Sequence, residues 1–142
     1  MSELVLPLHL LILAATAVAV LIADHDAYLW IKGRKQTLDA TRVVRLHWIV
    51  AAGLSGMVLT GIFLFLPKQT YLLGADYAFY IKMFFVFALF VNSFFIYRLL
   101  EISTTRQYSS LSSKERRPLF ISGAISTISW VGAAAAALFI LP

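Results

Sequence analysis

Four long apolar runs dominate this sequence, and almost no charged side chain interrupts them. They cover residues 4–23, 46–66, 83–97 and 119–141. A helix needs about 20 residues to cross the roughly 30 Å hydrocarbon layer of a bilayer, and the helices that contain these runs reach that length. The composition agrees, because 61% of the 142 residues are hydrophobic and only 13% are charged, against about 45–50% and about 25% in soluble domains. The sequence predicts one polytopic membrane domain, residues 1–142, and argues against a water-soluble enzyme.

The apolar runs and their boundary residues predict an all-α fold, an antiparallel bundle of four transmembrane helices. Leu66 and Pro67 are expected to end the second helix, and Pro118 suits the first turn of the fourth. The stretch Thr104–Ser113 is rich in serine and threonine and is expected to be mobile. The predicted helices cover about 4–31, 42–66, 77–100 and 118–141.

The basic residues predict the orientation of these helices. Of the 12 lysines and arginines, only Lys68 and Lys82 lie near one side of the predicted bundle, which leaves ten for the other side. Cytoplasmic loops carry an excess of Lys and Arg, so the connections 32–41 and 101–117 are expected in the cytoplasm and both termini outside. Tyrosine and tryptophan side chains, among them Trp30, are expected to form belts at the two interfaces.

The same counts exclude several classes of function. The chain has no cysteine, so disulfides, thiolate metal sites and thiol catalysis are excluded. The net charge of +5 is not arranged as the aromatic and basic surface of a nucleic-acid-binding module. No catalytic set and no phosphate-binding glycine loop is present.

Small residues form stripes that suit close helix packing, and polar residues inside the spans need partners. Asp26 is expected to pair with Arg45, or with Arg42 one turn away. Asn92 is expected to bind Asp24 or a backbone carbonyl across the bundle. The stripes comprise Ala15, Ala19 and Ala23; Ala52, Gly56 and Thr60; and Ser122, Ser126, Ser129 and Ala133.

Histidines suggest two further sites. His25 and His47 lie at similar depth on consecutive helices and could ligate a b-type haem, although the helical wheel turns both away from the small-residue stripes. No third ligand suggests zinc or copper. At the other end His9 and Lys82, with Trp130, could form a pocket for an anionic headgroup or a quinone carbonyl, although Lys82 could equally extend to the surface.

Five of these residues carry a resemblance that covers most of the chain. With His9, Asp24, Lys82, Asn92 and Trp130, the sequence resembles uncharacterised bacterial four-helix integral membrane proteins, which are distantly similar in layout to copper-resistance-D-like and cytochrome-b561-like bundles. The resemblance implies a bacterial inner-membrane protein and carries no activity. His25 and His47 lie outside its pattern.

The function we predict is a non-catalytic accessory or structural subunit that docks to a larger membrane complex or to copies of itself. Lipids are its other expected partners, and the phenylalanine-rich third helix offers an apolar flank to either. A b-type haem protein that passes electrons to quinone, through His25 and His47, is the first alternative. A small ion or proton conductor that uses Asp24, Asp26 and Asn92 is the second.

Overall fold

The computed structural model of the chain describes residues 2–65 and 77–140 and contains only helices in these ranges. They are α1 (Ser2–Ile31), α2 (Ala40–Phe65), α4 (Tyr77–Thr105), the short 3₁₀ helix η2 (Tyr108–Ser110) and α5 (Ser113–Ile140). The four long helices are each long and apolar enough to cross a membrane. The predicted all-α fold with four membrane-spanning helices is therefore confirmed.

Two boundaries differ from the prediction at the polar connection between the last two helices. α4 continues to Thr105, and α5 already begins at Ser113. Pro118 therefore lies inside α5, and Pro7 lies inside α1. Both prolines are in the second turn of their helices, close to the end where free N–H groups are normal. The stretch that was expected to be mobile is mostly helical, and η2 packs against the end of α1.

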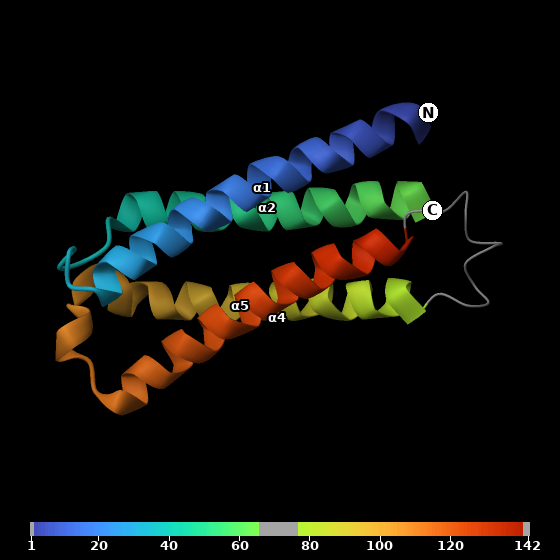
Figure 1. Cartoon of the computed structure of the whole chain (residues 1–142). Helices are drawn as coiled ribbons and strands as arrows, with labels where there is room; N and C mark the ends of the chain where they lie inside the picture. The colour runs from blue at the N-terminus through green and yellow to red at the C-terminus, as the bar shows by residue number, and fades with distance from the viewer. Residues whose placement is uncertain (1, 66–76, 141–142) are drawn as a thin grey trace.

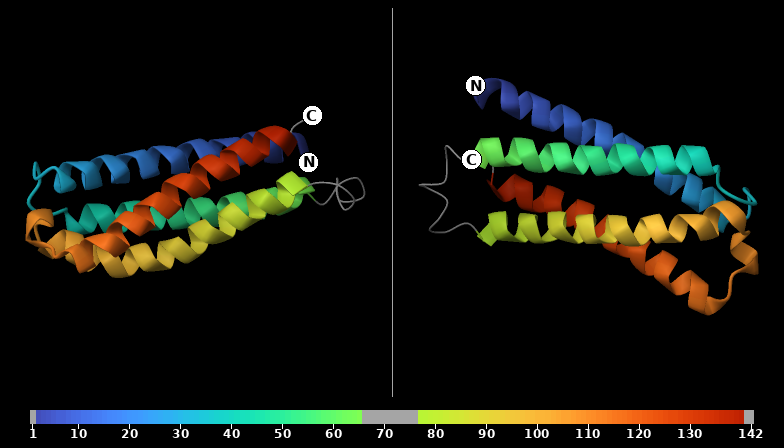
Figure 2. Two further views of the ribbon diagram at one scale, coloured as in Figure 1. Left: turned by 60° about the horizontal axis from the view of Figure 1, so that its bottom comes forward. Right: turned by 180° about the vertical axis from the view of Figure 1, so that it is seen from behind.

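The helices form two antiparallel hairpins, α1 with α2 and α4 with α5. In Figure 1 and in both views of Figure 2, α2 and α4 run side by side, and α1 and α5 cross them on the same side of that pair. α2 and α4 join the hairpins through a narrower contact, and α1 and α5 have no extensive contact with each other over the described residues. Each of these two helices thus packs closely against one neighbour only.

A glycine allows close packing within each hairpin. A Cβ on Gly53 would overlap the hydroxyl of Thr16, and a Cβ on Gly132 would overlap the ring of Phe85. Thr16 is 1% exposed, and its hydroxyl donates to the carbonyl of Ile12 at 2.6 Å. Helices in lipid associate through such small-residue contacts because burial of apolar surface gives them no advantage there.

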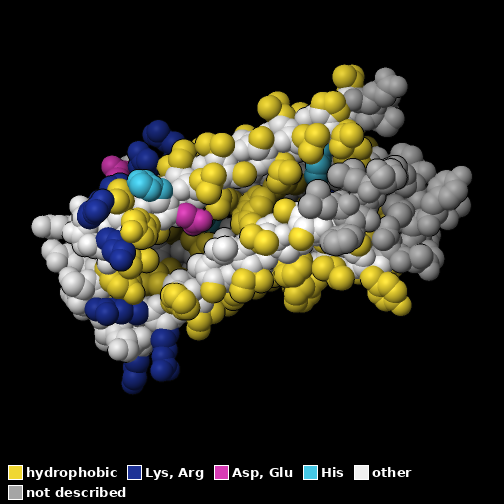
Figure 3. All heavy atoms as spheres, viewed as in Figure 1, with side chains coloured by type: hydrophobic (Ala, Val, Ile, Leu, Met, Phe, Trp, Pro, Cys, Tyr) yellow, Lys and Arg dark blue, Asp and Glu magenta, His cyan; other side chains and the backbone are white. Residues whose placement is uncertain are grey.

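The face of the bundle seen in Figure 3 is largely hydrophobic along its length and basic at one end. That end, which we call the basic end, contains the connections 32–39 and 106–112, and the opposite end contains the start of α1. Many large apolar side chains are exposed, among them Phe84, Phe87 and Phe94 on α4 at 67%, 68% and 80%. Such a surface suits contact with lipid.

Candidate functional site

Asp26 is a buried charged residue of the basic end. Its side chain is buried and lies between two cations, with Lys35 Nζ 2.6 Å from Oδ1 and Arg42 Nε 2.7 Å from Oδ2. Arg42 lies in the first turn of α2, where its backbone N–H also donates to Asp39. The carboxylate therefore ties α1, the following connection and α2 together.

Of the two partners that the sequence suggested for Asp26, the structure places Arg42 there and leaves Arg45 without an ion pair to any described residue. Lys35 is a third partner that the sequence reasoning missed. It lies nine residues beyond Asp26 in the connection, where the chain reverses at Gly33 with φ of +71°. Helical periodicity does not extend through such a turn, so no spacing rule could place Lys35.

Asp24, two residues earlier, has the opposite environment. It is exposed and forms no ion pair with any described residue. It belongs to the stripe of α1 that carries Ala17, Val20 and Ala27, whose side chains are half-buried. Figure 3 shows an acidic side chain within the otherwise largely hydrophobic face on which α1 and α5 lie. An exposed carboxylate in a membrane span is costly unless it finds a partner.

A small apolar cluster joins the two hairpins at the basic end. Trp30, Leu38 and Leu111 are buried together, and Tyr108 meets the Trp30 ring edge-on with centroids 5.2 Å apart. The indole N–H of Trp30 donates to the carbonyl of Arg106 at 3.0 Å. Trp30 is 3% exposed, so its expected place in an interfacial belt is wrong. Protein rather than headgroups covers this ring because η2 folds back over the end of α1.

The start of α5 has its own polar contacts. Glu115 accepts hydrogen bonds from the backbone N–H and the hydroxyl of Ser112, at 2.9 and 2.8 Å, and it forms an ion pair with Arg106. The contact with the Ser112 backbone satisfies an N–H group at the start of the helix that has no partner inside it. Arg116 lies over the ring of Tyr108, with its guanidinium carbon 4.9 Å from the centroid. These contacts hold the connection between α4 and α5 in an ordered conformation.

At the opposite end His9 lies against α2. Its Nδ1 is 2.7 Å from the hydroxyl of Thr60, and Thr60 in turn donates to the carbonyl of Gly56 at 2.8 Å. With the Thr60 proton used in this way, His9 Nδ1 is the donor and Nε2 stays free for another contact. No hydrogen bond joins His9 to Lys82 or to Trp130 among the described residues, so the pocket suggested for these three stays a prediction.

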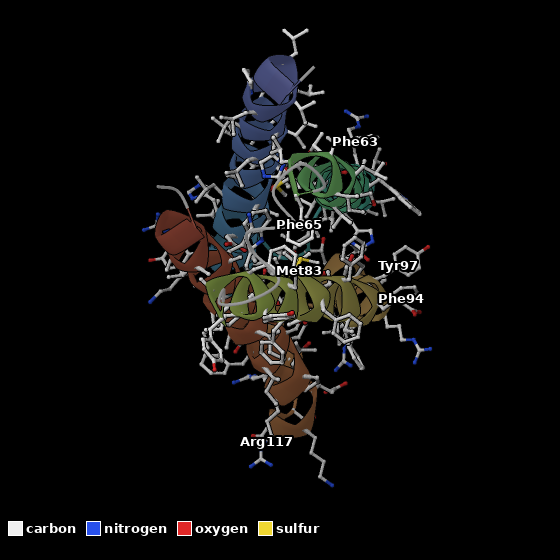
Figure 4. The ribbon with its side chains drawn as sticks, turned by 90° about the vertical axis from the view of Figure 1, so that its right-hand side faces the viewer. Phe63, Phe65, Met83, Phe94, Tyr97 and Arg117 are labelled. Atoms are coloured by element: carbon white, nitrogen blue, oxygen red, sulfur yellow. The ribbon has the colours of Figure 1, made fainter. Side chains whose placement is uncertain are left out.

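The two histidines considered for haem have different surroundings. His47 packs against Tyr97 of α4, with ring centroids 5.5 Å apart, and against Trp48. His25 is exposed, and it lies nine residues, about two and a half helical turns, from Thr16, which faces α2. Figure 4 shows Tyr97 directed outward from α4. His25 thus lies on the side of α1 opposite to α2, whereas His47 packs against α4. Haem ligation by this pair stays a prediction.

Asn92 forms the deepest polar contact of the bundle. Its Nδ2 donates to the carbonyl of Ser122 at 2.9 Å, and its Oδ1 accepts from the Ser122 hydroxyl at 2.8 Å. Both residues are buried, and they join α4 to α5. Of the two partners suggested for Asn92, the backbone carbonyl is the one observed, and Asp24 lies on the other hairpin. The residues of the suggested conduction path are therefore dispersed over separate contacts.

No protein-family model and no curated protein matches the sequence, and no solved structure matches the fold. Within the described ranges, no group of three His, Asp or Glu side chains is placed to hold a metal ion.

Proposed function

We propose that this protein is a small integral membrane interaction protein, an accessory or structural subunit that associates laterally with a membrane partner or with a second copy of itself. The surface that we assign to this role, the docking face, is the side of the bundle on which α1 and α5 lie. The exposed carboxylate of Asp24 is the observation that carries the proposal.

The arrangement of the helices supports a docking face on this side. Among the long helices, α1 packs extensively only against α2 and α5 only against α4, and α1 and α5 have no extensive contact with each other over the described residues. The apolar surface there continues along both helices, with Val18 and Leu21 exposed at 56% and 67% on α1, and Ile128 at 62% on α5. A transmembrane helix of a partner could pack along this surface as the helices do within each hairpin.

The exposed carboxylate of Asp24 favours contact of this face with a partner protein and not with lipid alone. Acyl chains offer no donor to a carboxylate, whereas a lysine, arginine or hydroxyl on a partner helix does. Asp26 shows the contrast, because its two cations come from its own chain.

The location in the membrane forms part of the proposal. We infer a bacterial cytoplasmic membrane, as the resemblance in layout implies, with the basic end in the cytoplasm and both termini outside. The domain would comprise residues 1–142 as one unit.

Counting the chains in each assembly tests the docking role. Membranes that contain the protein are extracted into polymer nanodiscs without detergent, and native mass spectrometry determines the composition of each particle. We expect the wild type in particles with a second polypeptide, and Asp24→Asn mainly as single chains, because a lost charge-assisted hydrogen bond weakens association about tenfold or more.

The control for this experiment is Glu101→Gln, which removes an exposed carboxylate at the basic end of α4. This variant should assemble as the wild type does. A wild type found only as single chains, or equal assembly of wild type and Asp24→Asn, would overturn the docking role.

A further inference from the structure

A surface hollow of about 350 Å³ lies at the start of α5, and no residue of α1 lines it. Its polar side is formed by Ser113, Arg116 and Arg117, and its apolar side by Phe120 and Ile121, with Tyr108 of η2 beside Arg116. One end of the hollow is thus cationic and the other hydrophobic. None of the contacts described for Asp26 or His9 involves it.

The two arginines leave positive charge and hydrogen-bond donors without a partner. Arg116 donates through Nη2 to the carbonyl of Ser109 at 3.1 Å, but its buried Nε has no acceptor among the described residues. Arg117 is exposed and forms no ion pair there, and Figure 4 shows it directed away from the bundle. The positive charges of Arg116 and Arg117 are thus not neutralised by an ion pair with any described residue and can attract an anion into the hollow.

The neighbouring acidic group does not supply that anion. Glu115 precedes Arg116 directly, but its carboxylate is already held by Ser112 and Arg106. The other described carboxylate with cationic partners, Asp26, is held by Lys35 and Arg42 on the other hairpin. The guanidinium fork of arginine matches the oxygen atoms of a phosphate group.

The apolar side of the hollow indicates what carries the phosphate. Phe120 and Ile121 are exposed at 78% and 55%, and they lie one turn further along α5, toward the hydrophobic length of the bundle. A free phosphate ion makes no favourable contact with these apolar side chains. The acyl chain of a phospholipid, whose phosphate lies on the arginines, would extend along them toward the hydrophobic part of the bundle.

We propose that this hollow is a binding site for an anionic phospholipid, with the phosphate on Arg116 and Arg117 and an acyl chain along Phe120 and Ile121. The hydroxyl of Ser113 adds a donor at the phosphate. The hollow lies in the first turns of α5, and none of its lining residues contacts Asp24, so its test does not depend on the docking role.

Binding is measured on the full chain in a non-ionic detergent, with phosphatidylglycerol, phosphatidylcholine or inorganic phosphate as the added probe. Thermal stability by tryptophan fluorescence and lipid adducts in native mass spectrometry are the two readouts. The titrations are made at about 0.5 M salt, because exposed charges more than a few Å apart are then largely screened. We expect phosphatidylglycerol to bind, and phosphatidylcholine and inorganic phosphate to bind at least tenfold more weakly.

Two matched variants separate a seated lipid from general attraction to a basic surface. Arg117→Gln and Lys114→Gln each remove one exposed positive charge from the same turn of α5, but only Arg117 lines the hollow. We expect Arg117→Gln to weaken phosphatidylglycerol binding about tenfold, because it removes hydrogen bonds as well as charge, and Lys114→Gln to change it less than about twofold once charges are screened.

Three results would overturn the proposal. Equal losses in the two variants would mean a diffuse basic surface, and equal binding of phosphatidylcholine would mean that the net charge of the headgroup is irrelevant. Displacement of the lipid by an equal concentration of inorganic phosphate would assign the site to the free ion. Phe120→Ala is a second test in case Arg117→Gln does not fold. It leaves both arginines in place and should weaken lipid binding without affecting the binding of inorganic phosphate.

Discussion

Two carboxylates on one turn of α1 have opposite environments. Asp26 is 4% exposed and accepts from Lys35 and Arg42, whereas Asp24 is exposed and has no ionic partner among the described residues. Residues two apart on a helix point to different sides, and this difference separates a residue that holds the chain together from one that is available to another molecule.

Replacement of the buried carboxylate should lower stability. Asp26→Asn leaves Lys35 and Arg42 facing each other without an anion between them. Since both cations are partly exposed and can take up water, we expect a loss of about 1–3 kcal/mol, the range for hydrogen bonds to charged groups. Thermal unfolding of the purified protein in detergent, followed by tryptophan fluorescence, measures the change.

Asp24→Asn is the matched control for that measurement. It removes the same charge two residues away, and the unfolding temperature of the isolated chain should stay at the wild-type value or rise. Equal destabilisation by the two substitutions would contradict the assignment of the ion pairs to Asp26.

At the scale of the helices, the two hairpins are held in the same way, by one close approach and few polar contacts. Gly53 meets Thr16 between α1 and α2, and Gly132 meets Phe85 between α4 and α5. The two contacts differ in whether the opposing side chain can move away from an added methyl group. The Phe85 ring is the end of a side chain that can rotate, whereas the Thr16 hydroxyl is held by its own helix through Ile12.

Gly53→Ala should therefore separate α1 from α2. The added methyl group overlaps Thr16, and such overpacking costs about 1–3 kcal/mol. Unfolding temperature in detergent is again the measurement. Gly123→Ala on α5 is the control, because its Cβ would meet nothing within 4 Å; it should leave stability unchanged or raise it slightly through the better helix propensity of alanine.

A Gly53→Ala variant as stable as the wild type would mean that the α1–α2 contact is wider than the structure has it. In that case Thr16→Ala, which removes the opposing hydroxyl, should also have no effect. If the contact is as described, Thr16→Ala combined with Gly53→Ala should recover part of the lost stability.

At the scale of the whole molecule, the hairpins are joined along α2 and α4 and at the basic end. There Trp30 of α1 donates to Arg106, and the backbone N–H of Leu38 donates to the carbonyl of Ser103 at 2.9 Å. At the opposite end the stacked rings of Phe65 and Phe79, 4.4 Å apart, bridge α2 and α4, and Figure 4 shows Phe65 directed toward α4 while Phe63 points outward. The two hairpins are thus in contact at both ends of the bundle, while α1 and α5 make no extensive contact with each other over the described residues.

The orientation of this bundle can be tested directly because the chain has no cysteine. Single cysteines at Gln36 and Ser109, in the two connections of the basic end, should react with an impermeant maleimide only after the cells are opened. Both positions are exposed, so labelling reports the compartment and not burial. A cysteine at Gln69 should react in intact cells, and the reverse pattern would invert the orientation inferred from the positive charges.

Much of the fold could be predicted from the sequence, because a span is a local property. Twenty apolar residues without charges have one stable arrangement in a bilayer, a helix that satisfies its own backbone hydrogen bonds. The number of helices and their approximate ranges followed from this alone. The sequence predicted a mobile stretch at 104–113 from its serine and threonine content, which describes only the local chain. In the structure Tyr108 and Leu111 pack against Trp30 and Leu38, at least 70 residues away.

The partners of the polar residues depended on the tertiary structure. The sequence by itself determined that Asp26 and Asn92 need partners, since each lies in or beside an apolar span. The structure gives Lys35 and Arg42 to the first and Ser122 to the second. These partners depend on the axial position of each helix relative to its neighbour. That register follows from contacts such as Gly53 with Thr16, and a hollow built from η2 and α5 exists only once those contacts have formed.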